Sequence, residues 1–350
     1  MKEMRNLLEK LSNAHGISGY EGDISALVRD ELKSYVDEVR VDSLGNLIAA
    51  KKGSRPSVML AAHMDEIGLM VKCVEDSGFI RFAKVGGWFD QTLLNQRVIL
   101  HAEKGPLIGV IGSKPPHRME EEERKKVVKA DDMFIDVGAS SKKDAEKLGI
   151  IPGVPITIDR EFRPLANDLV TGKAFDNRAG LVMMIGALKR TKTKSTIYAV
   201  GTVQEEVGLK GAKTSAFELS PDVALAAEIT IAGNHPGIEK KDSAIEIGKG
   251  PSLTVMDAAG RGIITPAPVL RWLEETAKRH EIPYQLDVSE GGTTDATAIQ
   301  LTKAGIPSGT VSLPMRYAHS PVEVLSLKDL DRCAELIARA LETVGGYFTR

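Results

Sequence analysis

The sequence contains little cysteine and little net charge. Its 350 residues include two cysteines, Cys73 and Cys333, which lie far apart and in no metal-ligand spacing. A single disulfide is one alternative, but two reduced thiols in a reducing compartment fit this usage better. The formal net charge of −2 gives no reason to expect a polyanion or an anionic membrane surface as a partner. We therefore expect no nucleic-acid partner.

Long apolar runs are also absent. No window approaches the roughly 18 consecutive apolar residues that indicate a membrane span. The opening segment, MKEMRNLLEK, is charged and has the pattern of an amphipathic helix, so it does not resemble a secretory signal. Apolar residues make up 42% of the chain and charged residues 27%, which is typical of a globular protein. The sequence predicts a cytoplasmic protein with no membrane partner, long enough for two domains.

Helical and strand-like patterns alternate along most of the chain. Apolar positions at three- and four-residue spacing predict helices at 2–12, 22–34, 177–190, 267–280, 294–304 and about 327–346. Short apolar runs predict strands at 57–62, 195–203, 223–227, 284–289 and 308–313. Strands that alternate with helices indicate an α/β fold with a mixed, mostly parallel sheet flanked by helices.

Residues 67–162 break this alternation. The segments there are short and strand-like, and Gly-Gly, Lys-Gly and Pro-Pro pairs separate them. The predicted strands lie at 68–74, 79–83, 97–102, 107–112 and 155–159. This pattern predicts a small β-rich domain inserted into an α/β domain that residues 1–66 and 163–350 form. The dense charge run at 120–126 is most simply a solvated surface segment.

Histidine and acidic residues stand at or just past the ends of predicted elements. They are His63, Asp176, the pair Glu205-Glu206, Glu228 and His319. Ligands bind outside the carboxyl ends of strands in open α/β sheets. Because the predicted strands 57–62, 195–203 and 223–227 each lead into one of these residues, we expect a shared site at this edge.

Each candidate also has an ordinary structural explanation. A histidine at a strand end is more often a hydrogen-bonded structural residue than a ligand. His63 is favoured as a ligand because Asp65 faces the same side of an extended chain and can accept a hydrogen bond from its second ring nitrogen. The alternative for Glu205-Glu206 is an exposed acidic turn, and the alternative for Asp176 is a helix N-cap.

The ligand types favour a catalytic metal pair. Oxygen and nitrogen ligands without thiolates suit zinc, cobalt or manganese better than a structural zinc site. Five ligands are too many for one open catalytic ion, but they suit two ions about 3.5–4 Å apart. Motifs of phosphate loops, dinucleotide sites and serine hydrolases are absent from the sequence. The run 291–295 is more simply an N-cap turn than an anion cradle.

Nine segments form a specific pattern when they are taken together and in order. They lie at 15–21, 63–68, 86–88, 95–98, 114–117, 134–139, 174–178, 203–208 and 316–321. This pattern resembles the M42 metallopeptidases, a family of tetrahedral (TET) aminopeptidases and glutamyl aminopeptidases. The resemblance extends from end to end of the chain.

The resemblance implies a ligand set for two divalent ions, zinc or cobalt. Asp176 would bridge the ions, with His63 and Glu228 completing one site and Glu206 and His319 the other. One departure is Glu228, where many members have aspartate. The longer side chain puts metal spacing or metal choice in question rather than the reaction.

The resemblance also implies a mechanism and an assembly. Glu205 would be the general base and acid, Asp65 would support His63, and the peptide bond after Asp176 would be cis. The fold would be of the zinc-exopeptidase type, with a small PDZ-like β-barrel inserted for dimerisation. The implied partners are peptides with a free N-terminus and further copies of the chain, built from dimers into a tetrahedral dodecamer.

Two other functions would fit part of the pattern. A metal-independent glycosidase of the cellulase type would use two carboxylates, but it would leave His63 and His319 without roles. A non-catalytic scaffold could bind peptide ends through the inserted domain, but it would have no use for the full ligand set. The sequence therefore favours a two-metal aminopeptidase.

Overall fold

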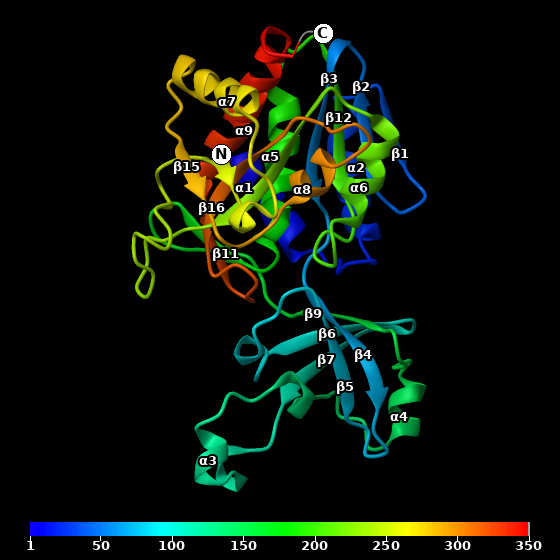
Figure 1. Cartoon of the computed structure of the whole chain (residues 1–350). Helices are drawn as coiled ribbons and strands as arrows, with labels where there is room; N and C mark the ends of the chain where they lie inside the picture. The colour runs from blue at the N-terminus through cyan, green and yellow to red at the C-terminus, as the bar shows by residue number, and fades with distance from the viewer. Residues whose placement is uncertain (349–350) are drawn as a thin grey trace.

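The computed structural model describes residues 1–348. A large mixed sheet covered by helices forms one part of the molecule, and a smaller barrel forms a separate lobe below it in Figure 1. This arrangement confirms the predicted α/β class. No helix in the described part of the chain combines the length and the apolar character needed to cross a membrane.

The main sheet has a parallel centre and antiparallel edges. Its order is β1 (Glu38–Val41), β2 (Leu47–Lys51), β12 (Ser195–Thr202), β3 (Ser54–His63), β13 (Val223–Ile231), β16 (Ser308–Arg316), β17 (Glu323–Ser326), β11 (Leu169–Gly172) and β10 (Arg163–Pro164). A further strand, β14 (Ser252–Met256), pairs with β16 and with β15 (Gln285–Val288). Since β12, β3, β13 and β16 are parallel, their carboxyl ends meet at one edge.

Helices bury both faces of this sheet. One face is covered by α1 (Lys2–Asn13), α2 (Gly22–Leu32), α5 (Phe175–Arg190), α7 (Ala267–Arg279) and α9 (Leu327–Thr343), and the other by α6 (Lys210–Leu219) and α8 (Asp295–Gln300). Strand β3 shows why the central run is apolar throughout. Leu60 joins the larger core cluster, whereas its neighbours Met59 and Ala61 join the cluster on the opposite face.

Six antiparallel strands close the barrel. They are β4 (Gly68–Val74), β5 (Ile80–Val85), β6 (Arg97–Ala102), β7 (Gly105–Gly112), β8 (Phe134–Asp136) and β9 (Pro155–Ile158). The barrel has its own apolar core, and two short helices, α3 (Glu121–Arg124) and α4 (Lys142–Lys147), lie between its strands in the sequence. The charge run containing α3 is exposed, as predicted. The domain boundaries at 67 and 162 remain our proposal.

Several elements differ from the sequence predictions. Strand β13 continues to Ile231, so Glu228 lies inside the strand rather than beyond its end. Helix α8 ends at Gln300, earlier than expected. The sequence predictions missed helices α3, α4 and α6 and strands β1, β2, β8, β10, β11, β14 and β17, because short segments carry weak periodicity. Cys73 is exposed and Cys333 is buried, and both are free thiols.

Candidate metal centre

His63 is the last residue of β3 and lies in the middle of the site. Its side chain is 2% exposed, and its Nε2 lies 3.1 Å from Asp176 Oδ1, 3.8 Å from Glu228 Oε2 and 3.9 Å from Glu205 Oε2. Its Nδ1 lies 3.1 Å from the backbone oxygen of Asp65. Nδ1–H donates to that oxygen, so Nε2 is the nitrogen directed at the carboxylates, as a metal ligand requires once it has lost its proton.

The contact to Asp65 differs from the one we expected. The Asp65 carboxylate was predicted to be the acceptor for the His63 ring. Its Oδ1 lies 3.5 Å from Nδ1, farther than the backbone oxygen of the same residue. Support of His63 by the side chain of Asp65 therefore stays a prediction, while its backbone provides the shorter contact.

Asp176 lies between the two histidines. Its Oδ1 faces His63, and its Oδ2 lies 3.4 Å from Nε2 of His319. The same Nε2 lies 3.4 Å from Oε2 of Glu206. The peptide bond from Asp176 to Asn177 is cis, as the family resemblance implied. Each carboxylate oxygen of Asp176 thus faces a different imidazole.

The N-cap explanation of Asp176 is wrong. Its backbone is non-helical, with φ −79° and ψ 104°. The capping role belongs to the next residue, since Asn177 Oδ1 accepts a hydrogen bond from the N–H of Gly180 at 3.0 Å. The Asn177 amide also donates to the backbone oxygen of Ala227 in β13, which ties this helix start to the sheet.

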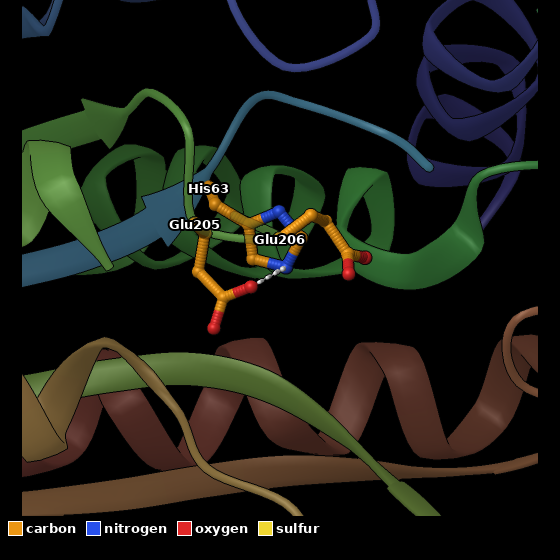
Figure 2. Close-up of side chains that lie close together, drawn as sticks. All are labelled: His63, Glu205 and Glu206. Carbon is orange, nitrogen blue, oxygen red and sulfur yellow. Dashed lines mark ion pairs between the residues drawn. The ribbon is translucent and has the colours of Figure 1, made fainter. Parts of the chain in front are cut away.

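A turn held by Asp65 directs the paired glutamates into the site. The Asp65 carboxylate accepts hydrogen bonds from the N–H groups of Glu205 at 3.0 Å and Glu206 at 3.2 Å. The preceding residue, Gln204, has a φ of 55°, which supplies the bend that an extended strand lacks. Figure 2 shows the Glu205 carboxylate pointing toward His63 while that of Glu206 points in another direction.

The exposed-turn explanation of the pair is therefore wrong. The side chains of Glu205 and Glu206 are 11% and 5% exposed. The candidate ligands form three overlapping groups whose donor atoms all lie within 4.8 Å of one another. The groups are His63 with Glu205 and Glu206, His63 with Asp176 and Glu228, and Asp176 with Glu206 and His319.

The electrostatics of the cluster favour a bound cation. Burial, reinforced by neighbouring carboxylates, raises the pKa of Glu205 and Glu228 well above the usual range. Hydrogen bonds to Asp176 and Glu206 raise the pKa of His319 to about 11. Burial would lower the pKa of His63. The charge of Glu205 and the hydrogen bond to Asp176 outweigh this effect, so the pKa of His63 is raised. Negative charge is thus in excess here.

The residues also fit a metal ion by their unused hydrogen-bonding capacity. Glu228 is 3% exposed, and its Oε1 has no hydrogen-bond partner. A buried carboxylate oxygen without a partner is costly unless a cation binds it. Two imidazoles and several carboxylates are the donor set that zinc and similar divalent ions accept.

The sequence predictions missed four residues around this cluster. Glu323 accepts hydrogen bonds from the N–H groups of Asp176 and His319, and the carbonyl of Gly87 lies 2.9 Å from Nδ1 of His319. The only signal in the sequence is that Glu323 and Gly87 belong to or closely follow motif segments.

The other two residues lie behind the ligands. Ser18 donates to the Asp65 carboxylate at 2.6 Å. Asp295 accepts from the hydroxyl of Thr202 at 2.5 Å, and burial raises its pKa to about 6. Asp295 opens α8, and the preceding Thr294 makes no side-chain capping bond, so the predicted N-cap turn at 291–295 lacks its capping contact.

Known proteins resemble this chain over nearly its whole length. A profile of the M42 glutamyl aminopeptidase family matches residues 45–336. A lysyl aminopeptidase of Pyrococcus furiosus is 38% identical over 340 residues, which cover 96% of this chain and 96% of the relative.

Solved structures agree with these matches. An aminopeptidase of Desulfurococcus kamchatkensis superposes with a TM-score of 0.93 at 45% identity, covering 97% of this chain and 95% of the other. The TET1 peptidase of Pyrococcus horikoshii is described as assembling into a tetrahedron or a large octahedral shell. It superposes with a TM-score of 0.86 at 36% identity, covering 97% of this chain and 99% of the other. A Thermotoga maritima protein described as an endoglucanase superposes with a TM-score of 0.79 at 31% identity, covering 96% of this chain and 97% of the other. The family profile and the extent of the sequence matches establish that the chain belongs to the M42 peptidase family.

Proposed function

We propose that this M42 family member is a two-metal aminopeptidase that releases amino acids from the N-termini of peptides. The observation that carries the proposal is the position of Asp176, whose two oxygens face His63 and His319. Glu228 lies beside the first imidazole and Glu206 beside the second. Asp176 would therefore bridge two ions, and each imidazole and neighbouring glutamate would complete one site.

Glu205 is the proposed general base and acid. When bound, two divalent ions supply Lewis acidity and lower the pKa of water. The Glu205 carboxylate accepts a proton from the water that attacks the scissile carbonyl and delivers it to the departing amine nitrogen. Its side chain is 11% exposed and lies beside His63, where it can both take a proton from water and return it to the amine.

The same site would favour a free N-terminus. The α-amine of the peptide would bind near one ion and the neighbouring carboxylates. An acylated N-terminus lacks this amine and gains no such stabilisation.

The test is metal removal followed by metal restoration. Dialysis against a chelator should abolish release of anilines from aminoacyl-anilides, and added Zn²⁺ or Co²⁺ should restore it, because the proposed chemistry needs both ions. Elemental analysis should give two ions per chain. Activity that survives complete removal of metal would contradict the proposal.

The same experiment separates the rival functions. A metal-independent glycosidase would cleave soluble cellulose with or without chelator, and the likeness to a protein described as an endoglucanase makes this assay worthwhile. The family assignment does not favour that rival, which gives no role to the two histidines. A peptide-binding scaffold would bind peptides and contain no metal.

We also propose a homo-oligomer. The barrel would act as the dimerisation domain, and dimers would assemble into a tetrahedral dodecamer. The support is the likeness to a TET peptidase that is described as tetrahedral, together with the separate barrel lobe. A cytoplasmic location remains a prediction from the sequence.

A further inference from the structure

Glu323 lies between the two backbone segments that carry proposed metal ligands. It is the first residue of β17 and is 2% exposed. Its Oε2 accepts from the N–H of Asp176 at 3.2 Å, and its Oε1 accepts from the N–H of His319 at 3.1 Å. Both carboxylate oxygens are thus used on backbone donors, and Glu323 belongs to none of the three ligand groups.

The segment that carries His319 needs such an anchor. His319 has a φ of 57° and Tyr317 a φ of 62°, and non-glycine residues rarely adopt this left-handed conformation. Such backbone persists only where surrounding contacts hold it. The hydrogen bond from the His319 N–H to Oε1 of Glu323, at 3.1 Å and with a buried acceptor, is a contact of this kind.

The His319 ring is held by a second contact, to the backbone of the barrel segment. Its side chain is 39% exposed, so packing alone does not fix its orientation. Its Nδ1 donates to the carbonyl of Gly87, in the loop that follows β5. A Cβ at position 87 would lie 2.8 Å from that nitrogen, so the absence of a side chain permits this approach.

We propose that Glu323 and the Gly87 carbonyl are positioning groups that build the metal site of Glu206 and His319. This inference rests on the proposed function. The site of His63 and Glu228 depends on them less, because His63 is a buried strand residue. The bridging Asp176 is also held through Asn177, whose side chain bonds to Ala227 and Gly180. The second site is therefore assembled from both lobes of the molecule.

Glu323→Gln tests the first positioning group with little change in shape. A carboxylate can accept from both N–H groups, whereas a glutamine amide offers one oxygen and one NH₂. One backbone N–H would then face another donor. Gly87→Ala tests the second group, because the new methyl group would displace the His319 ring.

The measurement is titration of the metal-free full-length proteins with CoCl₂, followed by calorimetry and by the visible absorption of bound Co²⁺. Wild-type protein should bind two ions per chain. Each variant should bind one ion about as tightly as wild type and the second roughly 10- to 100-fold more weakly. The visible absorption of the weakly bound Co²⁺ should differ from that of the second ion in wild type, while the absorption of the tightly bound Co²⁺ should not change.

Two matched substitutions serve as controls. Glu342→Gln changes a glutamate that also accepts a backbone N–H, that of Lys192. Gly22→Ala adds a methyl group where no atom lies within 4 Å. Both should bind two ions like wild type. Thermal melting of the metal-free proteins shows whether each variant folds. If Glu323→Gln does not fold, the metal titration of Gly87→Ala tests the inference.

The outcomes distinguish the inference from the proposed function. Two ions bound with wild-type affinities in both variants would overturn the inference. Equal weakening of both ions would also overturn it, because that result indicates a general structural role. A wild-type protein that never binds a pair of ions would instead overturn the proposed function.

Discussion

Asp65 shows how a single buried carboxylate can orient several groups of the site. Its side chain accepts hydrogen bonds from the Ser18 hydroxyl and from the N–H groups of Glu205 and Glu206. Its backbone carbonyl accepts a hydrogen bond from Nδ1 of His63. Burial would raise the pKa of Asp65, but the contact with His63 and these hydrogen bonds lower it. Asp65 thus stays ionised and fixes the turn that carries the proposed base.

Glu205→Gln is the sharpest test at the residue scale. The amide keeps the shape of the side chain but cannot accept a proton, so kcat should fall by roughly 10²- to 10⁴-fold. Metal content should not change, since Asp176, His63 and His319 remain. Steady-state kinetics and elemental analysis check both points, with the exposed Glu218→Gln as control. Near-normal turnover would assign the base elsewhere.

At the scale of elements, α5 and β13 approach so closely that a glycine is needed between them. A Cβ on Gly180 would lie 2.2 Å from the backbone oxygen of Ala227 and 2.3 Å from Oδ1 of Asn177. This contact matters for the site because Asp176 and Asn177 lie in the first turn of α5, while Glu228 follows Ala227 in β13. The helix and the strand thus set the spacing of two proposed ligands.

Gly180→Ala should destabilise the protein. Alanine improves helix propensity by about 0.5–1 kcal/mol, but overpacking at such a contact costs about 1–3 kcal/mol. The free energy of unfolding in urea should therefore fall, whereas Gly22→Ala, at an unobstructed position, should leave it nearly unchanged or raise it slightly. Equal stability of the two variants would show that α5 can move away from the sheet.

A hydrogen-bonded trio joins the segment after α1 to the barrel and predicts a pH dependence of stability. The hydroxyl of Thr157 lies 2.8 Å from His15 Nδ1 and 2.8 Å from His101 Nε2. Burial, then the charge of Lys173, lowers the pKa of His15 to about 4, although Glu66 acts in the other direction. Between that value and its ordinary pKa near 6.5, His15 is protonated mainly in the unfolded chain.

Stability should therefore fall as pH falls from about 6.5 toward 4. The unfolded state binds more protons in this window, so the free energy of unfolding rises with pH and the contribution of neutral His15 is complete above about 6.5. His15→Gln should reduce this slope in urea unfolding at a series of pH values. An unchanged slope in the variant would show that other groups control the acid sensitivity.

At the scale of the whole molecule, the proposed assembly makes a size prediction. Light scattering of the purified protein should give about twelve times the 37.8 kDa mass of one chain. Ile108 and Val110, on β7, are 57% and 45% exposed and alternate along one strand, so they form an apolar part of the barrel surface. Ile108→Lys with Val110→Lys should release monomers.

The matched control lies on the main sheet. Leu286 and Val288, on β15, are similarly exposed at 48% and 65%. The same lysine substitutions there should leave at least a dimer, because the proposed dimer contact is on the barrel. Monomers from the β15 variant and intact dimers from the β7 variant would assign the dimer contact to the sheet.

Much of the fold could be predicted because it depends on local pattern. The apolar run before His63 predicts β3, and the three- and four-residue spacing predicts α1 and α9. The edge strand β1 escaped prediction because Glu38–Val41 has only four residues, too few for the alternation of Val39 and Val41 to indicate a strand. The capping residue of α5 was not identified from the sequence, because Asp176 and Asn177 are both residue types that cap helices and only the structure shows that Asn177 does so.

The sequence by itself determined the α/β class and the set of candidate ligands and predicted a β-rich insertion, because periodicity and side-chain chemistry are local properties of the chain. Only the tertiary structure decided which oxygen of Asp176 faces which imidazole, and that Glu323 and Gly87 hold His319. Those contacts join segments up to 232 positions apart, and their geometry depends on how strands, helix and barrel pack, which no local pattern encodes.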